Sequence, residues 1–304
     1  MELKAKYSGV IVPMVSPFND NFSVDKNAVK TIVNSFILNE IKPFIIGTTG
    51  EGVSISAHQK LDLLKSTVDA ASGKQPVLAG ISGNSIFTSI EEGKVFADMG
   101  VSALVATLPN FYPMDASQMA NWFEMIANSV PLPLFIYNIP ATTHHSVPLE
   151  VIEKLSYHPN IIGVKDSERN QERLDESLKL WKHRNDFLFL VGWAAMSTYG
   201  LEKGASGIIP STGNLCPELF QQLYQAVKNG NTELANELQQ QTDQISTLYQ
   251  KGRNLSHSLV ALKVIMSMKN LCGTQVMPPL FKMSAQEEIA YRRDMLVEFK
   301  NLNI

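Results

Sequence analysis

Short apolar segments alternate with longer amphipathic segments along this chain, and this alternation constrains the fold more than any other feature. The apolar segments are rich in Val, Ile, Leu and Phe, and they cover residues 9–18, 43–51, 76–82, 103–109, 133–140, 161–167, 187–193 and 205–212. Between them, apolar residues recur every three or four positions in segments such as 25–40, 57–72 and 117–130, as one buried face of a helix requires. The pattern predicts eight strand–helix units.

The apolar segments are nearly continuous rather than alternating with polar residues, which is typical of strands covered on both faces by helices. Eight parallel strands of this kind can close into a (β/α)₈ TIM barrel. A doubly wound open sheet is the structural alternative, but the glycine-rich turn that it needs after its first strand is missing after residues 9–18. The sequence therefore predicts an α/β protein with a TIM barrel.

Strand-like segments stop at about Pro217, and the remaining sequence has a helical pattern, as in residues 233–252 and 259–271. No linker rich in Gly, Ser or Pro precedes this part of the chain. We predict a barrel with the active site in residues 1–228 and a C-terminal helical extension, residues 229–304, packed on the barrel.

Composition excludes several classes of partner. The formal net charge is −3 with a pI near 6.1, and the basic residues are scattered, so neither nucleic acid nor an anionic membrane is an expected partner. The chain has two cysteines, too few for a disulfide framework, and no zinc-type spacing. With no apolar run of membrane-helix length and no cleavage-type leader, we expect a cytoplasmic protein.

Polar residues at the ends of the predicted strands are the candidates for chemistry, because the loops after the strands meet at the active-site face of a barrel. They are Thr48, Thr49, Glu51, Tyr137, Asn138, Lys165, Asp166, Ser211 and Thr212.

Lys165 follows the apolar residues 161–164 and would be partly shielded from water. Shielding favours the neutral amine, the form that attacks a carbonyl, so Lys165 is a candidate for Schiff-base formation. Its position fits equally well a lysine paired with a barrel carboxylate. Tyr137 could relay protons or could fill core space.

The turn GTTGEG at residues 47–52 offers hydroxyls and backbone amides that suit a carboxylate, although it could be an ordinary turn. A phosphate-binding P-loop is excluded because the motif lacks the Gly-Lys-Ser/Thr ending.

Four motifs in order carry a family resemblance: GTTGEG at 47–52, YNIP at 137–140, GVKDS at 163–167 and GIIPST at 207–212. With LVALKVIM and MPPL near the C-terminus, the chain resembles, over nearly its full length, the N-acetylneuraminate lyase and dihydrodipicolinate synthase superfamily of class I pyruvate aldolases.

The resemblance implies a role for each site residue. Lys165 would form the Schiff base, Tyr137 would shuttle protons, and Thr48 and Thr49 would bind the pyruvate carboxylate and hold the tyrosine. Ile209 would offer its backbone carbonyl near bound pyruvate. Further substrate contacts are predicted for Gly192, Ser167 and Thr142. The protonated imine is an electron sink, so neither a metal nor an organic cofactor is expected.

Three departures from the family pattern narrow the range of possible substrates. Thr142 stands where dihydrodipicolinate synthases usually carry an arginine, and Ala194 and Ala195 stand where sialic acid lyases have acidic residues. Phe111 takes the place of an interface tyrosine, with Tyr112 next to it.

We therefore expect a pyruvate-forming lyase that cleaves a 2-keto-3-deoxy sugar acid to pyruvate and an aldehyde. Residues 193–195 form an apolar wall that favours a short aldehyde half, while Thr142, Thr143, His144 and Ser167 could bond a sugar chain. His144 and His145 could equally be solvated loop residues.

Other functions fit the same motifs. The alternatives are dihydrodipicolinate synthase or N-acetylneuraminate lyase proper, a dehydratase using the same imine, and a non-catalytic sensor of 2-oxo acids.

A homo-oligomer, dimer or tetramer, is implied by the resemblance, with Phe111 and Tyr112 as the dimer contact. Alternatively, their loop packs on its own chain.

Overall fold

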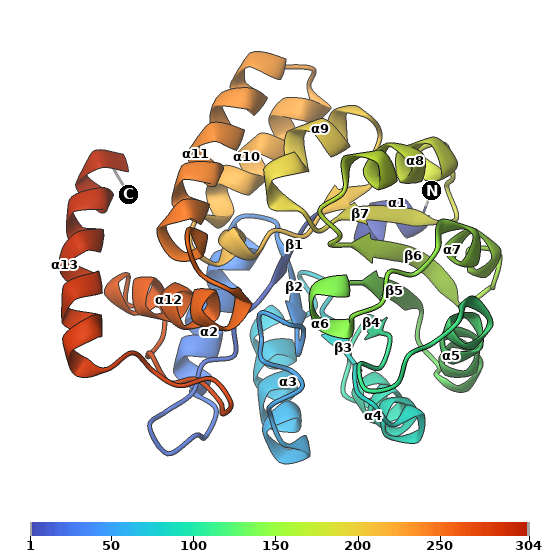
Figure 1. Cartoon of the computed structure of the whole chain (residues 1–304), viewed down its shortest axis with the longest axis horizontal. Helices are drawn as coiled ribbons and strands as arrows, with labels where there is room; N and C mark the ends of the chain where they lie inside the picture. The colour runs from blue at the N-terminus through green and yellow to red at the C-terminus, as the bar shows by residue number, and fades with distance from the viewer. Residues whose placement is uncertain (1, 303–304) are drawn as a thin grey trace.

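A closed barrel of eight parallel strands forms the centre of the molecule (Figure 1). The computed structural model describes residues 2–302. The strands are β1 (Gly9–Pro13), β2 (Lys42–Ile45), β3 (Leu78–Gly80), β4 (Ala103–Thr107), β5 (Leu134–Asn138), β6 (Ile161–Asp166), β7 (Leu188–Val191) and β8 (Gly207–Ile208). Each strand pairs with the next in sequence, and β8 pairs with β1. The predicted TIM barrel is confirmed.

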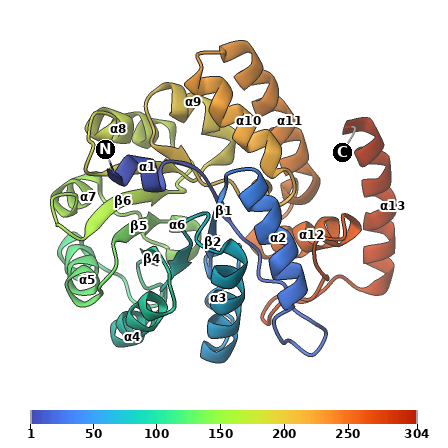
Figure 2. The ribbon, with the colours of Figure 1, turned by 180° about the vertical axis from the view of Figure 1, so that it is seen from behind.

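Helices surround the barrel on all sides (Figure 2). They are α2 (Lys26–Leu38), α3 (Ala57–Ala71), α4 (Ile86–Asp98), α5 (Ala116–Ser129), α7 (Leu149–Leu155), α8 (Gln171–Trp181), α9 (Ser197–Glu202) and α10 (Pro217–Lys228). Local sequence explains where several of them begin. Ser56 and Asp115 each form a capping box with a glutamine three residues later, which satisfies free amides in the first turn of α3 and α5.

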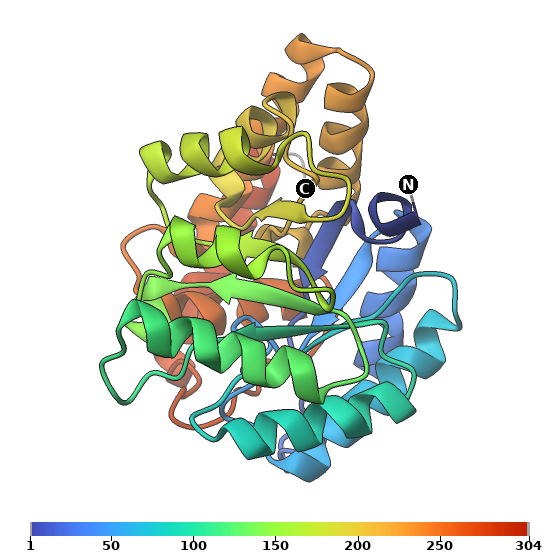
Figure 3. The same cartoon turned by 90° about the vertical axis from the view of Figure 1, so that its right-hand side faces the viewer.

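The barrel interior is a packed core rather than a channel. Inward-facing residues of seven strands, among them Ile11, Phe44, Leu78 and Phe135, form one buried cluster. The short helix α1 (Glu2–Tyr7) lies at the N-terminal end of the strands (Figure 3). Its Tyr7 joins this cluster and donates a hydrogen bond to the backbone oxygen of Ser102 at 2.6 Å. The opposite end of the barrel is therefore the one open to a ligand.

The strands are shorter than the apolar segments of the sequence. β1 ends at Pro13 rather than at residue 18, and β8 contains two residues, Gly207 and Ile208. The residues that follow, such as Met14, Val15 and Ile209, are buried although they pair in no strand. The loops at the C-terminal ends of the strands are thus part of the core.

Three helices follow the barrel: α11 (Thr232–Gln250), α12 (Leu255–Met268) and α13 (Ala285–Leu302). In Figure 1 they continue from α10 along one side of the barrel, with α13 outermost. Every residue of α12 from Ser258 to Met266 is buried, so this helix lies inside the molecule and not on its surface. The predicted C-terminal helical extension is present, while its division from the barrel at residue 228 stays a prediction.

Within residues 2–302, no helix is both long enough and apolar enough to cross a bilayer.

Candidate active site

Lys165 and Tyr137 lie side by side at the C-terminal ends of β6 and β5. The two residues are register partners in the parallel sheet, and both are buried, with 3% and 4% of their surfaces exposed. Lys165 Nζ lies 3.8 Å from the centre of the Tyr137 ring and 5.1 Å from the centre of the Phe44 ring. The amine therefore rests against aromatic faces inside the barrel.

Lys165 makes no ion pair with any residue that the structure describes. The two buried carboxylates of the strand-end motifs are paired elsewhere, Asp166 with Arg173 and Glu51 with Lys263. The structure therefore does not support the alternative in which Lys165 is neutralised by a barrel carboxylate.

The loop after β2 brings its threonines to the same place. Thr48 Oγ1 lies 3.5 Å from the Tyr137 hydroxyl, and the neighbouring Thr49 is buried. Glycines allow this loop to pass close to other backbone: a Cβ on Gly52 would lie 2.1 Å from the backbone oxygen of Ile46, and one on Gly50 would lie 2.9 Å from that of Met14. The path of the loop thus requires glycine at positions 50 and 52.

A cavity of about 700 Å³ opens beside this group. Of the residues singled out in the sequence, Thr48, Glu51, Tyr137, Thr142 and Thr143 line it. The last two belong to the short helix α6 (Pro140–Thr143) after β5. Hydroxyl and amide side chains line much of the rest, among them Ser82, Asn84, Ser85, Thr88 and Asn110. Lys60 is the single cationic residue of the lining, and Glu92 neutralises it at 2.6 Å.

The other predicted residues, Lys165 and Thr49 among them, lie outside the lining of this cavity. Ile209 is buried in the same inner cluster as Tyr137. Gly192 and Ser167 are neighbours, because a Cβ on Gly192 would lie 2.1 Å from Ser167 Oγ. The structure thus brings Lys165, Tyr137 and Thr48 together as one group, with Gly192 and Ser167 as another.

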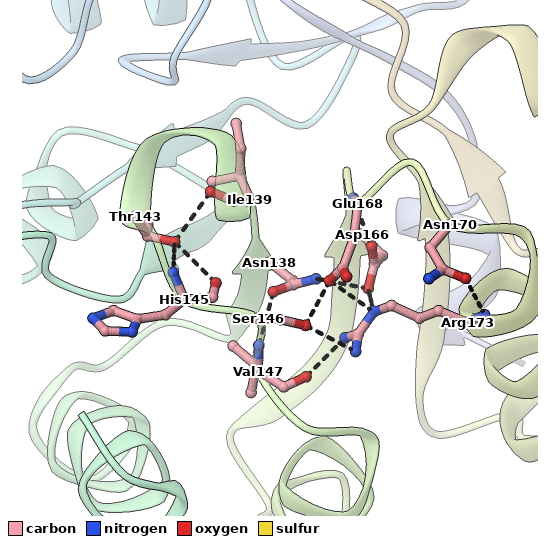
Figure 4. A network of polar contacts seen from close by, with 10 residues as sticks. All are labelled: Asn138, Ile139, Thr143, His145, Ser146, Val147, Asp166, Glu168, Asn170 and Arg173. Atoms are coloured by element: carbon pink, nitrogen blue, oxygen red, sulfur yellow. Dashed lines mark hydrogen bonds and ion pairs between the residues drawn. The ribbon is translucent and has the colours of Figure 1, made fainter. Parts of the chain in front are cut away.

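A polar network that the sequence did not reveal ties the ends of β5 and β6 together (Figure 4). Asn138 follows Tyr137, Asp166 follows Lys165, and the Asn138 side-chain amide donates to Asp166 Oδ2 at 3.1 Å. Arg173 on α8 donates through Nε to the same oxygen at 2.7 Å. Burial raises the pKa of the Asp166 carboxyl above its usual value, although Arg173 acts in the opposite direction.

The same network holds the segment after α6. Asn138 Oδ1 accepts a hydrogen bond from the backbone amide of Val147, and Arg173 donates to the backbone oxygen of Val147 at 2.9 Å. Ser146 and Asn138 both donate to Glu168 Oε2. The outward-facing neighbours of Lys165 and Tyr137 therefore fix the two strands and the adjoining loop relative to one another.

Phe111 and Tyr112 project from the loop between β4 and α5. They are 74% and 73% exposed and contact each other edge to face, with ring centres 4.9 Å apart. The loop therefore does not bury these rings on its own chain, and the dimer contact stays a prediction. His144 is exposed, while the His145 ring lies 3.0 Å from the backbone oxygen of Tyr112.

The fold and these residues define a class of protein: a TIM barrel with a buried lysine against a tyrosine at the C-terminal ends of adjacent strands. A model of the dihydrodipicolinate synthetase family matches residues 6–296. The chain belongs to this family, and the predicted superfamily is confirmed.

Named relatives agree with this assignment. The chain is 28% identical to an uncharacterized DapA-like lyase of Thermofilum pendens, over 87% of this chain and 89% of the relative. It is 29% identical to a 4-hydroxy-tetrahydrodipicolinate synthase of Pseudoalteromonas atlantica, over 77% and 80%. A dihydrodipicolinate synthase structure from Bacteroides thetaiotaomicron is 31% identical, with a TM-score of 0.89 over 95% of this chain and 98% of that one. The chain is an enzyme of the lyase or aldolase type.

Proposed function

We propose that this enzyme cleaves a 2-keto-3-deoxy sugar acid to pyruvate and an aldehyde through a Schiff base on Lys165. The observation that carries the proposal is the position of the Lys165 amine, 3.8 Å from the centre of the Tyr137 ring and free of any carboxylate partner among the described residues. An unpaired amine shielded from water can attack a ketone, and a phenol beside it can move protons.

The first half of the proposed reaction forms the imine. The Lys165 amine attacks the C2 carbonyl carbon, and the carbinolamine loses its hydroxyl as water when Tyr137 supplies a proton. The resulting tyrosinate then takes the proton from the C4 hydroxyl. The C3–C4 bond breaks, the aldehyde leaves, and the electron pair of that bond moves into the protonated imine to give an enamine.

The second half releases pyruvate. The Tyr137 hydroxyl returns its proton to C3 of the enamine, and the tyrosinate accepts a proton from the water that hydrolyses the imine. Thr48 and Thr49 would hold the carboxylate of the substrate and orient the Tyr137 hydroxyl, and Ile209, Gly192 and Ser167 would contact the bound keto acid. In this scheme the imine alone accepts the electrons, so we expect activity to survive dialysis against a metal chelator.

The chemistry of the cavity favours a neutral, hydroxylated aldehyde half. Thr142 supplies a hydroxyl, and the lining cation, Lys60, is already paired with Glu92. A second carboxylate on the substrate would need an arginine or lysine whose charge is not already neutralised by an acidic residue. A dihydrodipicolinate synthase reaction is disfavoured on this ground, although relatives carry that name.

Product analysis tests the proposal. A panel of 2-keto-3-deoxy acids is incubated with the enzyme, and free pyruvate is measured with lactate dehydrogenase. We expect pyruvate from at least one sugar acid, at a rate well above that of condensation between pyruvate and an aldehyde bearing a second charged group. A dehydratase would consume the acid without releasing pyruvate, and a sensor would bind pyruvate without turnover, so either result would reject the lyase.

A further inference from the structure

A buried ion pair connects the C-terminal extension to the loop that carries the two threonines. Lys263 lies on α12 and Glu51 lies in the loop after β2, and their charged atoms are 2.5 Å apart. Both side chains are 1% exposed. These partners come from opposite ends of the chain, and neither acts in the reaction proposed above.

The ammonium group of Lys263 has further partners. It donates to the backbone oxygen of Ser16, in the loop after β1, at 2.8 Å and to that of Gln275 at 2.7 Å. Two of the three ammonium protons are thus donated to backbone oxygens, and the carboxylate of Glu51 balances the charge. Lys263 thus joins three separate segments at one point.

The carboxylate of Glu51 is held from the other side. Glu51 Oε2 accepts a hydrogen bond from the backbone amide of Met277 at 2.6 Å. Glu51 itself has a left-handed backbone, with φ of 56°, at the end of the segment that carries Thr48 and Thr49. The Ser16 side chain also donates to the backbone oxygen of Gly50 at 2.6 Å. The loop is therefore anchored within two or three residues of the threonines.

Stability alone is a weak reason for such a pair. Taking two charges out of water opposes folding, and apolar residues of similar size often replace a buried pair with equal or greater stability. Unlike apolar contacts, the ion pair fixes the distance and direction between the segments that it joins.

We infer that Lys263 and Glu51 are positioning residues for catalysis: through them α12 fixes the loop at residues 47–52. That loop carries Thr48, whose hydroxyl lies 3.5 Å from that of Tyr137, and its neighbour Thr49. The C-terminal extension is then part of the machinery that binds the keto acid. This inference rests on the proposed function, in which those threonines hold the substrate carboxylate.

The double variant Lys263→Met/Glu51→Gln separates positioning from charge compensation. Neither single change is as informative, because removing one partner leaves an unpaired buried charge that destabilises the fold. The double variant leaves no charge, and the glutamine keeps an acceptor for the Met277 amide. A control is Lys282→Met/Asp20→Asn, which removes an exposed ion pair between the C-terminal extension and the loop after β1, with side chains 41% and 94% exposed.

We expect the double variant to fold and to need roughly ten times more pyruvate for half-maximal borohydride trapping, about 1.4 kcal/mol of lost binding. KM should rise by a similar factor, with a smaller change in kcat, and the control should match the parent. A folded double variant with the parent's KM and trapping curve would overturn the inference, because a merely structural pair would recover fully once both charges are gone.

Hydrogen exchange makes the inference testable apart from the chemistry. Amides of residues 47–52 should exchange faster in the double variant than in the parent, while those of α8 remain unchanged. If the parent itself never traps pyruvate, the proposed function fails. The hydrogen-exchange rates at residues 47–52 then still show whether the ion pair anchors the loop. Unchanged exchange at 47–52 overturns the inference in either case. Should the double variant not fold, Lys263→Met/Glu51→Met, which fills the site with apolar side chains and also leaves no charge, is measured with the same two readouts.

Discussion

Replacing Arg173 by methionine tests whether the network behind the catalytic pair stabilises the barrel. The change removes the 2.7 Å contact with Asp166 and the 2.9 Å hydrogen bond to the backbone oxygen of Val147. Asp166 is 7% exposed, so its carboxylate would lose its cation without gaining water. Breaking a buried pair on one side typically destabilises by about 3–5 kcal/mol.

The expected loss lies at the lower end of that range. Asp166 keeps hydrogen bonds from the Asn138 side chain and from the Glu168 backbone amide. It can also take up a proton, because burial already raises the pKa of its carboxyl. We predict a loss of about 3 kcal/mol near neutral pH, a large part of the ~5–15 kcal/mol that stabilises a typical protein.

The loss should depend on pH in a defined direction. Because its pKa is raised on folding, the Asp166 carboxyl binds a proton more tightly in the folded state. Its contribution to stability is therefore present at low pH and disappears as the pH rises above the ordinary value of 3.8 towards the raised one. Removing the opposing Arg173 widens this window, so Arg173→Met should be less destabilising at pH 5 than at pH 8.

Equilibrium urea unfolding, followed by tryptophan fluorescence and circular dichroism, measures these differences. Arg293→Met is the control, because Arg293 pairs with Asp294 at 3.1 Å with 76% of its side chain exposed, and we expect a change below about 0.5 kcal/mol. The double variant Arg173→Met/Asp166→Asn should recover much of the loss. A cost of less than about 1 kcal/mol for Arg173→Met, or strict additivity in the double variant, would refute the reasoning.

Three further changes test other parts of the account. Tyr137→Phe should still trap pyruvate on the enzyme while turnover falls about 10² to 10⁴-fold, the range that general acid–base groups supply; an undiminished rate would remove the phenol from the proton path. Partial burial raises the pKa of the Cys272 thiol to about 11, so roughly 0.1% is thiolate at pH 8 and iodoacetamide should label it slowly until the chain unfolds. Rapid labelling of the native protein would contradict this raised pKa. Phe111→Ser/Tyr112→Ser should lower the mass measured by light scattering if these rings form the dimer contact, and an unchanged mass would place the contact elsewhere.

The sequence was sufficient to predict the barrel because each strand is buried on both faces and each helix on one. The same logic overestimated strand length. Residues 14–18 and 209–210 are mostly apolar, like the strands before them, but most of them lie in buried loops at the active-site end. An apolar segment indicates that its residues are buried, not that they pair in a strand. Burial continues beyond the last hydrogen bond of each strand.

The site was predicted in part. Lys165 and Tyr137 stand in recognisable motifs, and the sheet register that makes them neighbours follows from the barrel. Arg173 and Lys263 were not singled out, because each lies in a helix whose pattern predicts only a buried face. Their partners became evident only when the fold brought the β5 and β6 ends to α8, and the loop after β2 to α12.

Borohydride reduction in the presence of pyruvate, followed by mass measurement of the intact chain and its peptides, tests the central claim most directly. The account predicts one pyruvyl adduct per chain, located on the Lys165 peptide and absent from a folded Lys165→Ala variant. An adduct that persists in that variant, or none at all in the parent at saturating pyruvate, would contradict it.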